Sequence, residues 1–415
     1  MEKRRRRITV TAAASIIPDD LLVSEVLVRL PARSLARCRC VCRSWRAGIA
    51  AAAFVRRHLE LSRAAQYHHP SVLAIPRRID SLDNRATCED ISFHRLLLPP
   101  PGPRRRARAP PEIVHAELVL EKAWPDEGIT RLIDPAHCDG LVAVATVTDR
   151  VFVCNPATGE FVALPLGSHN AELDHYDYDN FVPQVALGFD RWRKHYVVAR
   201  YFYRTYAGGG QDDDVGHEVF ALGAGGGGSW EPTQDPPHAV GVQRPMCTRR
   251  AFYWHADEPE PRLMRFGLRD RAFAVVRRPP TGWNPVDDML DLEDGSKLCY
   301  VHAAADASFQ VWLADDDDEE LRWSLRCRID LLDPDPGVQY NLMPVAAADD
   351  GDTLVAHAIG TLWKYDMGNQ GAEEAVVEMH NVMYGRRDGS KFFLAQSFHS
   401  EHHILPYIES LVAIA

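Results

Sequence analysis

At 415 residues, with 46% apolar and 25% charged residues, the chain has the composition of a globular protein and not of a disordered segment or a coiled coil. No window approaches the run of about twenty apolar residues that a membrane-spanning helix needs, so we expect no membrane partner. A net charge of −11 makes the whole chain a poor general binder of nucleic acid, and we expect no nucleic-acid partner either.

Residues 1–14 are expected to form a disordered basic tail. Lys3 to Arg7 could act as a nuclear import signal or could simply be a solvated terminus. Pro18-Asp19-Asp20 offers no small-residue cleavage site, which argues against a secretory signal peptide. The nine cysteines are odd in number and irregularly spaced, as in reduced proteins. We therefore expect an intracellular protein, in the nucleus, the cytoplasm or both.

Residues 15–61 are predicted to form a small module of three short helices. Pro18 suits a first helical turn, and Leu22, Val26 and Leu30 follow at fourfold spacing. Pro31 interrupts this helix and can itself open a second one.

The second predicted helix carries apolar residues at three- and four-residue steps from Leu35 through Trp45. A third is expected from Ile49 through Phe54 towards Leu59. A module of this size cannot bury all of its apolar side chains internally, so we expect at least one exposed stripe that a partner covers.

Residues 62–415 are predicted to be all β. Alternating runs at Ser71–Ile75, Ile91–Leu98 and Ile113–Lys122 read as strands. Two further turns, at Asp149-Arg150 and Asn155–Gly159, divide Gly140–Leu164 into a three-stranded meander.

Comparable pairs of strands recur along the rest of the chain, with starting points near residues 151, 218, 263, 309 and 362, mostly about fifty residues apart. A degenerate repeat of meanders is typical of propeller blades. With the earlier strands counted, we expect a six- or seven-bladed propeller-like domain, so that the whole chain is a multidomain α+β protein. A linear array of β-sandwiches is the alternative, but it would expose open sheet edges.

No motif for catalysis or for a cofactor is evident, and we expect neither. A phosphate-binding loop, a nucleophile elbow and a zinc-protease motif are all missing. Cys38, Cys40 and Cys42 would not converge on one face of a helix, so they are expected to pack as small apolar residues and not to bind zinc. The acidic run Asp315–Glu320 lacks the glycine and the ligand spacing of a calcium loop.

The opening stretch of about forty residues contains the set Ile17-Pro18-Asp19-Asp20-Leu21-Leu22, Glu25-Val26-Leu27, Arg29-Leu30-Pro31, Ser34-Leu35, Arg37, Cys40-Val41-Cys42-Arg43-Ser44-Trp45 and Phe54. This set resembles an F-box of the plant type.

The remainder contains the short pieces Cys138-Asp139-Gly140-Leu141, Asn155-Pro156-Ala157-Thr158-Gly159, Leu187-Gly188-Phe189-Asp190, Glu218-Val219-Phe220 and Phe252-Tyr253-Trp254. These pieces are similar to parts of the F-box-associated region of plant F-box proteins.

The resemblance implies that the module docks on a Skp-type adaptor, and through it on a cullin-RING ubiquitin ligase, while the β domain captures an unknown protein substrate. The expected adaptor-binding residues are Pro18, Leu21, Leu22, Val26, Leu30, Pro31, Leu35, Val41, Cys42 and Trp45. Two other classes stay open: an interaction scaffold outside any ligase, and a propeller hydrolase or lectin with charged residues converging on its axis.

Overall fold

The structure is a computed structural model. It describes residues 18–68, 70–78, 90–98, 113–123, 132–171, 184–207, 213–223, 228–241, 243–256, 261–292, 295–316, 320–331, 340–348, 352–358, 360–368, 372–394 and 400–414. The expected tail at 1–14, with its Lys3–Arg7 run, lies outside these ranges, and so does part of the acidic run at 315–320.

The N-terminal module consists of short helical segments. Their bounds are α1 Asp19–Leu21, the π-helical η1 Leu22–Val26, the 3-10 segment η2 Leu27–Arg29, α2 Ala32–Cys38, α3 Arg43–Ala50 and α4 Ala52–His68. None of the helices in the described part of the chain is long and apolar enough to cross a lipid bilayer.

Two of the helix predictions need correction. The single helix expected through Trp45 is broken after Cys38, and α3 starts afresh with Cys42 as its N-cap, whose Sγ accepts a hydrogen bond from the Trp45 backbone N–H at 3.4 Å. The third helix is divided at Ala51, and its second part, α4, continues past Leu61 to His68.

The rest of the described chain is built of strands. Their bounds are β1 Ser71–Arg78, β2 Asp90–Leu97, β3 Val114–Ala123, β4 Ala136–Cys138, β5 Leu141–Ala145, β6 Val151–Asn155, β7 Glu160–Ala163, β8 Val185–Asp190, β9 His195–Thr205, β10 Asp214–Ala221, β11 Glu231–Pro232, β12 Met246–Cys247, β13 Ala251–Ala256, β14 Arg262–Gly267, β15 Phe273–Val276, β16 Asp288–Leu292, β17 Lys297–Ala305, β18 Ser308–Asp315, β19 Ser324–Asp330, β20 Met343–Ala348, β21 Thr353–Ala358, β22 Thr361–Asp366, β23 Ala372–Glu378, β24 Val382–Gly385, β25 Lys391–Phe393 and β26 Ser400–Pro406.

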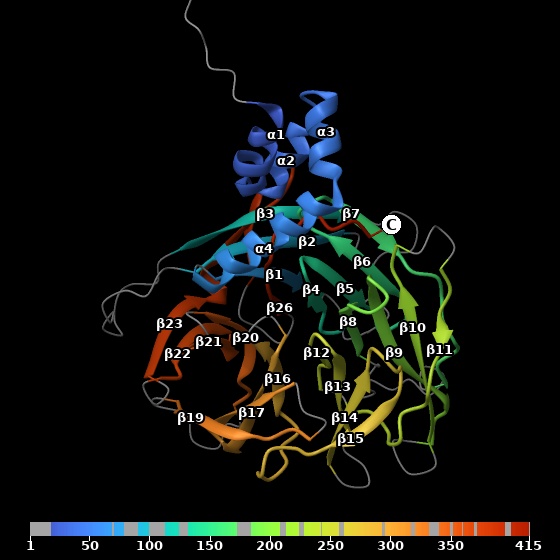
Figure 1. Ribbon diagram of the computed structural model, residues 1–415. Helices are drawn as coiled ribbons and strands as arrows, with labels where there is room; N and C mark the ends of the chain where they lie inside the picture. Colours follow the sequence, from blue (N-terminus) through green and yellow to red (C-terminus); the bar gives the residue numbers. More distant parts are fainter. Residues whose placement is uncertain are drawn as a thin grey trace, which may run out of the picture.

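These strands form six blades. Blades 1 to 5 are the consecutive four-stranded meanders β4–β7, β8–β11, β12–β15, β16–β19 and β20–β23, while blade 6 has the strand order β26-β1-β2-β3-β24-β25. The inner strands contact one another in the cyclic order β4, β8, β12, β16, β20, β26 and back to β4. The ring is therefore closed, and six blades is the correct one of the two expected counts (Figure 1).

Blade 6 closes the ring because the two ends of the propeller share one sheet. The C-terminal strand β26 pairs antiparallel with β1, from Val72 opposite Pro406 to Arg78 opposite Ser400. On the outer side β24 adds to β3 in parallel, and β25 pairs with β24. Because the inner strand β26 pairs with the second strand β1, backbone hydrogen bonds join the first and last parts of the propeller in one sheet.

The propeller core is distributed over the contacts between blades, with one apolar cluster for each neighbouring pair. Strand β5 shows how one sequence serves two clusters, because Leu141 and Ala143 pack towards blade 2 while Val142 and Val144 pack towards blade 6. Each such side chain, once buried, contributes roughly 1 to 3 kcal/mol. The uninterrupted apolar run of β5 is thus explained by burial on both faces.

Candidate interaction sites

Apolar side chains of the first helical segment are exposed. Leu21 and Val26 are each 49% accessible, Leu22 is partly accessible, and Pro18 is exposed at the start of the segment. The Pro18 carbonyl accepts a hydrogen bond from the Leu22 backbone N–H at 3.0 Å, which begins the helical turn. These residues form an apolar surface on the module that no described part of the chain covers.

A second exposed apolar site is the turn between α2 and α3. Val41 is 64% accessible and Cys42 is also exposed, whereas Trp45 is half-buried against the core of the module. The side chain of Cys42 caps α3, so its position follows from the helix that it begins.

The remaining expected adaptor-binding residues differ in their exposure. Pro31 is exposed and starts α2, and Leu30 is half-buried with its carbonyl accepting a hydrogen bond from His58 Nε2 at 3.0 Å. Burial lowers the pKa of His58, so the ring stays neutral. Leu35, another expected adaptor-binding residue, is completely buried because α2 turns its side chain into the module core.

The core of the module is completed by two residues from the propeller. Leu35, Ile49 and Phe54 pack in one cluster with Ala157, from the turn between β6 and β7, and with Leu411, from the C-terminal segment. The module and the propeller therefore share buried surface and are not joined merely by a linker.

Asn155 holds the C-terminal segment at this junction. Its side chain is completely buried and donates hydrogen bonds to the carbonyls of Ser410 at 3.2 Å and Val412 at 2.8 Å, while Oδ1 accepts from the backbone N–H of Ala157 at 3.0 Å. The Asn-Pro-Ala-Thr-Gly stretch is thus a turn, and its asparagine holds the segment from Ser410 to Val412 against the helical module by hydrogen bonds.

Asp139 makes a second link, between α4 and blades 1 and 2. It is 6% accessible and accepts hydrogen bonds from Arg63 Nε at 3.0 Å and from the Tyr196 hydroxyl at 2.9 Å. Burial and the neighbouring carboxylate raise the pKa of Tyr196, so its hydroxyl keeps the proton that it donates. Next to it, Gly140 has φ +84° and a Cβ there would lie 2.4 Å from the Ile408 carbonyl oxygen, so only glycine fits.

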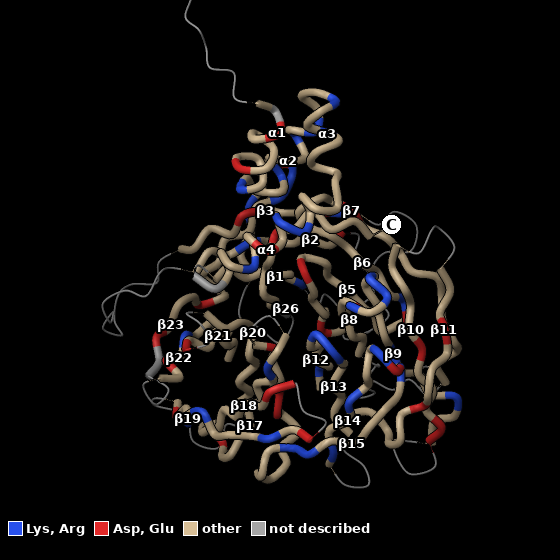
Figure 2. Tube along the Cα trace, in the orientation of Figure 1, with Lys and Arg blue, Asp and Glu red and all other residues tan. Residues whose placement is uncertain are grey.

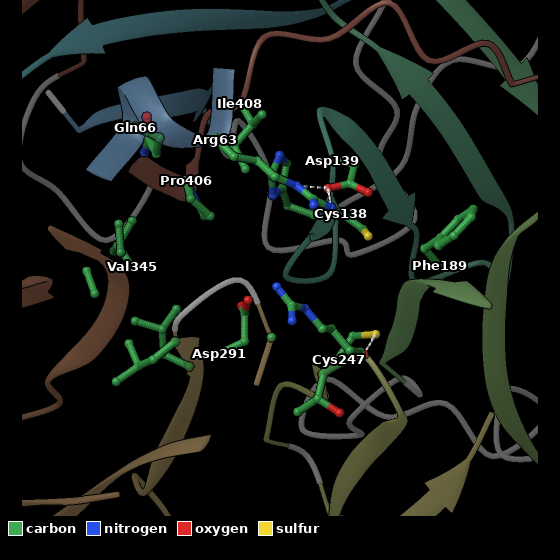
Figure 3. Close-up of a pocket in the computed structure, with 18 of the residues that line it drawn as sticks. Arg63, Gln66, Cys138, Asp139, Phe189, Cys247, Asp291, Val345, Pro406 and Ile408 are labelled. Carbon is green, nitrogen blue, oxygen red and sulfur yellow. Dashed lines mark hydrogen bonds and ion pairs between the residues drawn. The ribbon is translucent and has the colours of Figure 1, made fainter. Parts of the chain in front are cut away.

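A cavity of about 400 Å³ lies at the centre of the ring on the face that carries α4 (Figure 3). All six inner strands or their ends contribute to its wall, and Arg63 and Gln66 of α4 close one side. Its charged lining is mixed, with Arg63, Arg191 and Arg249 beside Asp139 and Asp291. Sequence reasoning did not identify this cavity, although the quoted Cys138-Asp139-Gly140-Leu141 motif marks one part of its wall.

The two cysteines that line the cavity are poor nucleophiles. Cys138 and Cys247 both line it, but burial raises the pKa of each thiol well above its ordinary value, which keeps both protonated and poorly nucleophilic. Within the described residues no group of three or more His, Cys, Asp or Glu side chains is arranged to hold a metal ion.

A helical module with exposed apolar side chains, fixed to a closed six-bladed propeller with an open central cavity, defines a two-part interaction protein. The model of the F-box associated beta propeller domain matches residues 121–358, and that of the F-box domain matches residues 15–50. The chain therefore belongs to the F-box proteins with an F-box-associated propeller.

Curated relatives from Arabidopsis thaliana agree with this assignment. The F-box/LRR-repeat protein At2g43260 is 26% identical over 76% of this chain and 67% of its own length, and the putative F-box protein At3g52320 is 26% identical over 78% and 75%. The F-box protein At1g11270 is 24% identical over 72% of this chain and 87% of its own. The predicted plant F-box family is confirmed.

Proposed function

We propose that this protein is the substrate-recognition subunit of a Skp-cullin-F-box ubiquitin ligase. The observation that carries the proposal is the set of exposed apolar side chains on an F-box whose opposite side is already covered by the propeller. Exposed Leu21, Val26 and Val41 supply apolar surface that a partner can bury. A Skp-type adaptor is the partner that the F-box match supports.

In this role the protein itself does no bond chemistry. It raises the local concentration of a bound substrate near the charged conjugating enzyme, which lowers the entropic part of the barrier to ubiquitin transfer. The junction at Asn155, Leu411 and Arg63 supports this role, because a receptor anchored by buried contacts holds its substrate in a defined position relative to the adaptor.

The adaptor surface is tested with Val26→Asp and Val41→Asp. Both side chains are exposed, so the changes should leave folding intact while placing a charge in the proposed interface. Each variant is expected to lose at least tenfold in affinity for a purified Skp-type adaptor, measured by calorimetry, whereas Leu325→Asp on the outer strand of blade 4 should bind normally. Normal binding by both Val variants would refute the proposed interface.

A reconstituted ligase separates the proposed role from that of a scaffold outside any ligase. Assembly with adaptor, cullin and RING subunits should allow ubiquitin transfer to a substrate bound on the propeller, and Val26→Asp should abolish that transfer. Substrate binding without transfer in the complete assembly would instead support the scaffold.

A further inference from the structure

Three neighbouring turns on the cavity face carry a concentration of basic side chains, which we call the basic face. It is made up of Arg191, Arg193 and Lys194 between β8 and β9, Arg249 and Arg250 between β12 and β13, and Arg269 between β14 and β15. Figure 2 shows Lys and Arg segments at the inner ends of blades 2 and 3. This is unexpected in a chain with a net charge of −11.

Hydrogen bonds between blades 2 and 3 and within blade 3 hold the three turns together. Arg193 donates to the backbone carbonyls of Leu268 at 2.8 Å and Arg269 at 3.3 Å, and the Leu268 backbone N–H donates to the Arg250 carbonyl at 2.8 Å. Asp190 neutralises Arg193 through an ion pair at 2.9 Å. Arg193 is thus the structural member of the group, and it fixes the spacing of the others.

Three of the other cations are exposed on this scaffold. Arg191, Lys194 and Arg269 are exposed, and the Arg191 guanidinium lies 5.7 Å from the ring centre of Trp192, which is itself 39% accessible. An exposed aromatic ring among several cations is a surface suited to a chain that carries both carboxylates and apolar groups.

The basic face continues into the central cavity. Arg191 and Arg249 belong to both, and the cavity wall beyond them includes the apolar side chains of Phe189, Leu290 and Ile408 (Figure 3). A volume of about 400 Å³ accommodates one or two large side chains and is too small for a folded element.

We propose that the basic face and the cavity together bind an acidic, extended segment of a protein substrate, with an apolar side chain of that segment inserted into the cavity. This deepens the proposed function, since it names the chemistry of the substrate that the receptor would capture. Carboxylates would pair with Arg191, Lys194 and Arg269, and the cavity would select for the apolar side chain.

The charges around the basic face favour a short acidic peptide over a nucleic acid. Asp270 is exposed within the β14–β15 turn, and Asp291 is exposed at the end of β16 in the neighbouring blade 4. The chain as a whole is also acidic, so a long polyanion would meet repulsion beyond the three turns. A peptide can end or change charge where the basic face ends.

The test is fluorescence anisotropy with the full chain and a labelled twelve-residue peptide of Asp and Glu around a central Leu-Phe pair. Binding is expected to weaken with salt, and R191E/K194E/R269E should weaken it at least tenfold. The matched control R328E/R387E/K391E makes the same change in net charge on outer, exposed positions of blades 4 and 6, and should weaken binding less than threefold.

Two further probes examine the parts of the proposal separately. A peptide with Gly-Gly in place of Leu-Phe should bind at least fivefold more weakly if the cavity takes an apolar side chain. The proposal is overturned if an Asn/Gln peptide binds equally well, if both triple variants lose the same affinity, or if oligouridine of equal length binds more tightly than the peptide. Adaptor affinity of R191E/K194E/R269E should stay normal, so failure here leaves the ligase role untouched.

Discussion

The shared core between the helical module and the propeller makes a quantitative prediction for Leu411→Ala. This side chain is 4% accessible and packs among the buried residues of α2, α3 and α4 although it belongs to the C-terminal segment. If the helical module depends on the propeller for its stability, removing the Leu411 side chain should destabilise the helices of the module.

The expected loss follows from the surroundings of Leu411. Burial of this kind makes Leu→Ala cost about 2 to 5 kcal/mol, depending on how far the site can collapse. Collapse is limited here because Asn155 fixes the backbone on both sides, through Ser410 and Val412. We therefore expect about 3 kcal/mol, which corresponds to roughly a hundredfold faster local opening.

Hydrogen exchange followed by mass spectrometry measures this effect for each helix. Amides of α2 and α3 should exchange about a hundredfold faster in Leu411→Ala, whereas Leu166→Ala, at a 74% accessible position, should leave them unchanged. If α2 and α3 exchange at the normal rate while urea unfolding shows a destabilised propeller, the module is autonomous and the argument from a shared core fails.

Three further predictions use other features of the fold. Gly140→Ala should lower the free energy of unfolding in urea by at least about 2 kcal/mol more than Gly159→Ala. Both glycines have positive φ, but only at Gly140 would the added Cβ meet a backbone atom, the Ile408 carbonyl oxygen. Equal losses in the two variants would contradict this reasoning. Arg63→Ala should cost about 3 kcal/mol of unfolding free energy, because it leaves the buried Asp139 carboxylate with the Tyr196 hydroxyl but without a cation. The double change Arg63→Ala with Asp139→Asn should cost less than the single change; strict additivity would argue against the ion pair. Burial lowers the pKa of His217 to about 3 in the folded protein, whereas the unfolded chain has a value of about 6.5. Below pH 6.5 the unfolded state therefore binds the proton more readily, and the free energy of unfolding falls by up to about 1.4 kcal/mol per pH unit between pH 6.5 and 5. His217→Gln should remove this loss, and an unchanged pH profile would contradict the prediction.

Local patterns predicted the outer parts of the blades well. The starting points near 151, 218, 263, 309 and 362 fall on or close to β6, β10, β14, β18 and β22, which are the third strands of blades 1 to 5. Each is followed by a turn and the fourth strand, so the repeat that can be recognised in the sequence is the outer hairpin of each blade. This hairpin can be predicted because residue alternation and turn residues are local features of the sequence.

Features that depend on distant contacts were not predictable in the same way. The inner strand β12 spans only Met246–Cys247, too short to show any period, and the pairing of β26 with β1 joins the two ends of the propeller. The break between α2 and α3 has no glycine or proline to announce it, and it depends on a cysteine as helix cap.

The adaptor surface shows the same limit within a single motif. The F-box resemblance placed Leu35 among the expected adaptor-binding residues. Helical spacing could not test this, because it shows which residues share a face and not whether that face is buried. Leu35 is buried because the propeller supplies Ala157 and Leu411 to the same cluster, whereas Val41 stays exposed at a turn that spacing did not predict.

The placement of α4 connects the two proposed binding surfaces. Its first half contributes Phe54 and His58 to the module, and its second half contributes Arg63 and Gln66 to the cavity wall. One continuous helix thus runs from the proposed adaptor-binding module to the proposed substrate cavity (Figure 1). A substrate segment bound at the basic face would contact the same helix whose other end packs in the F-box, so the distance between adaptor and substrate would depend on helix geometry and not on a flexible linker.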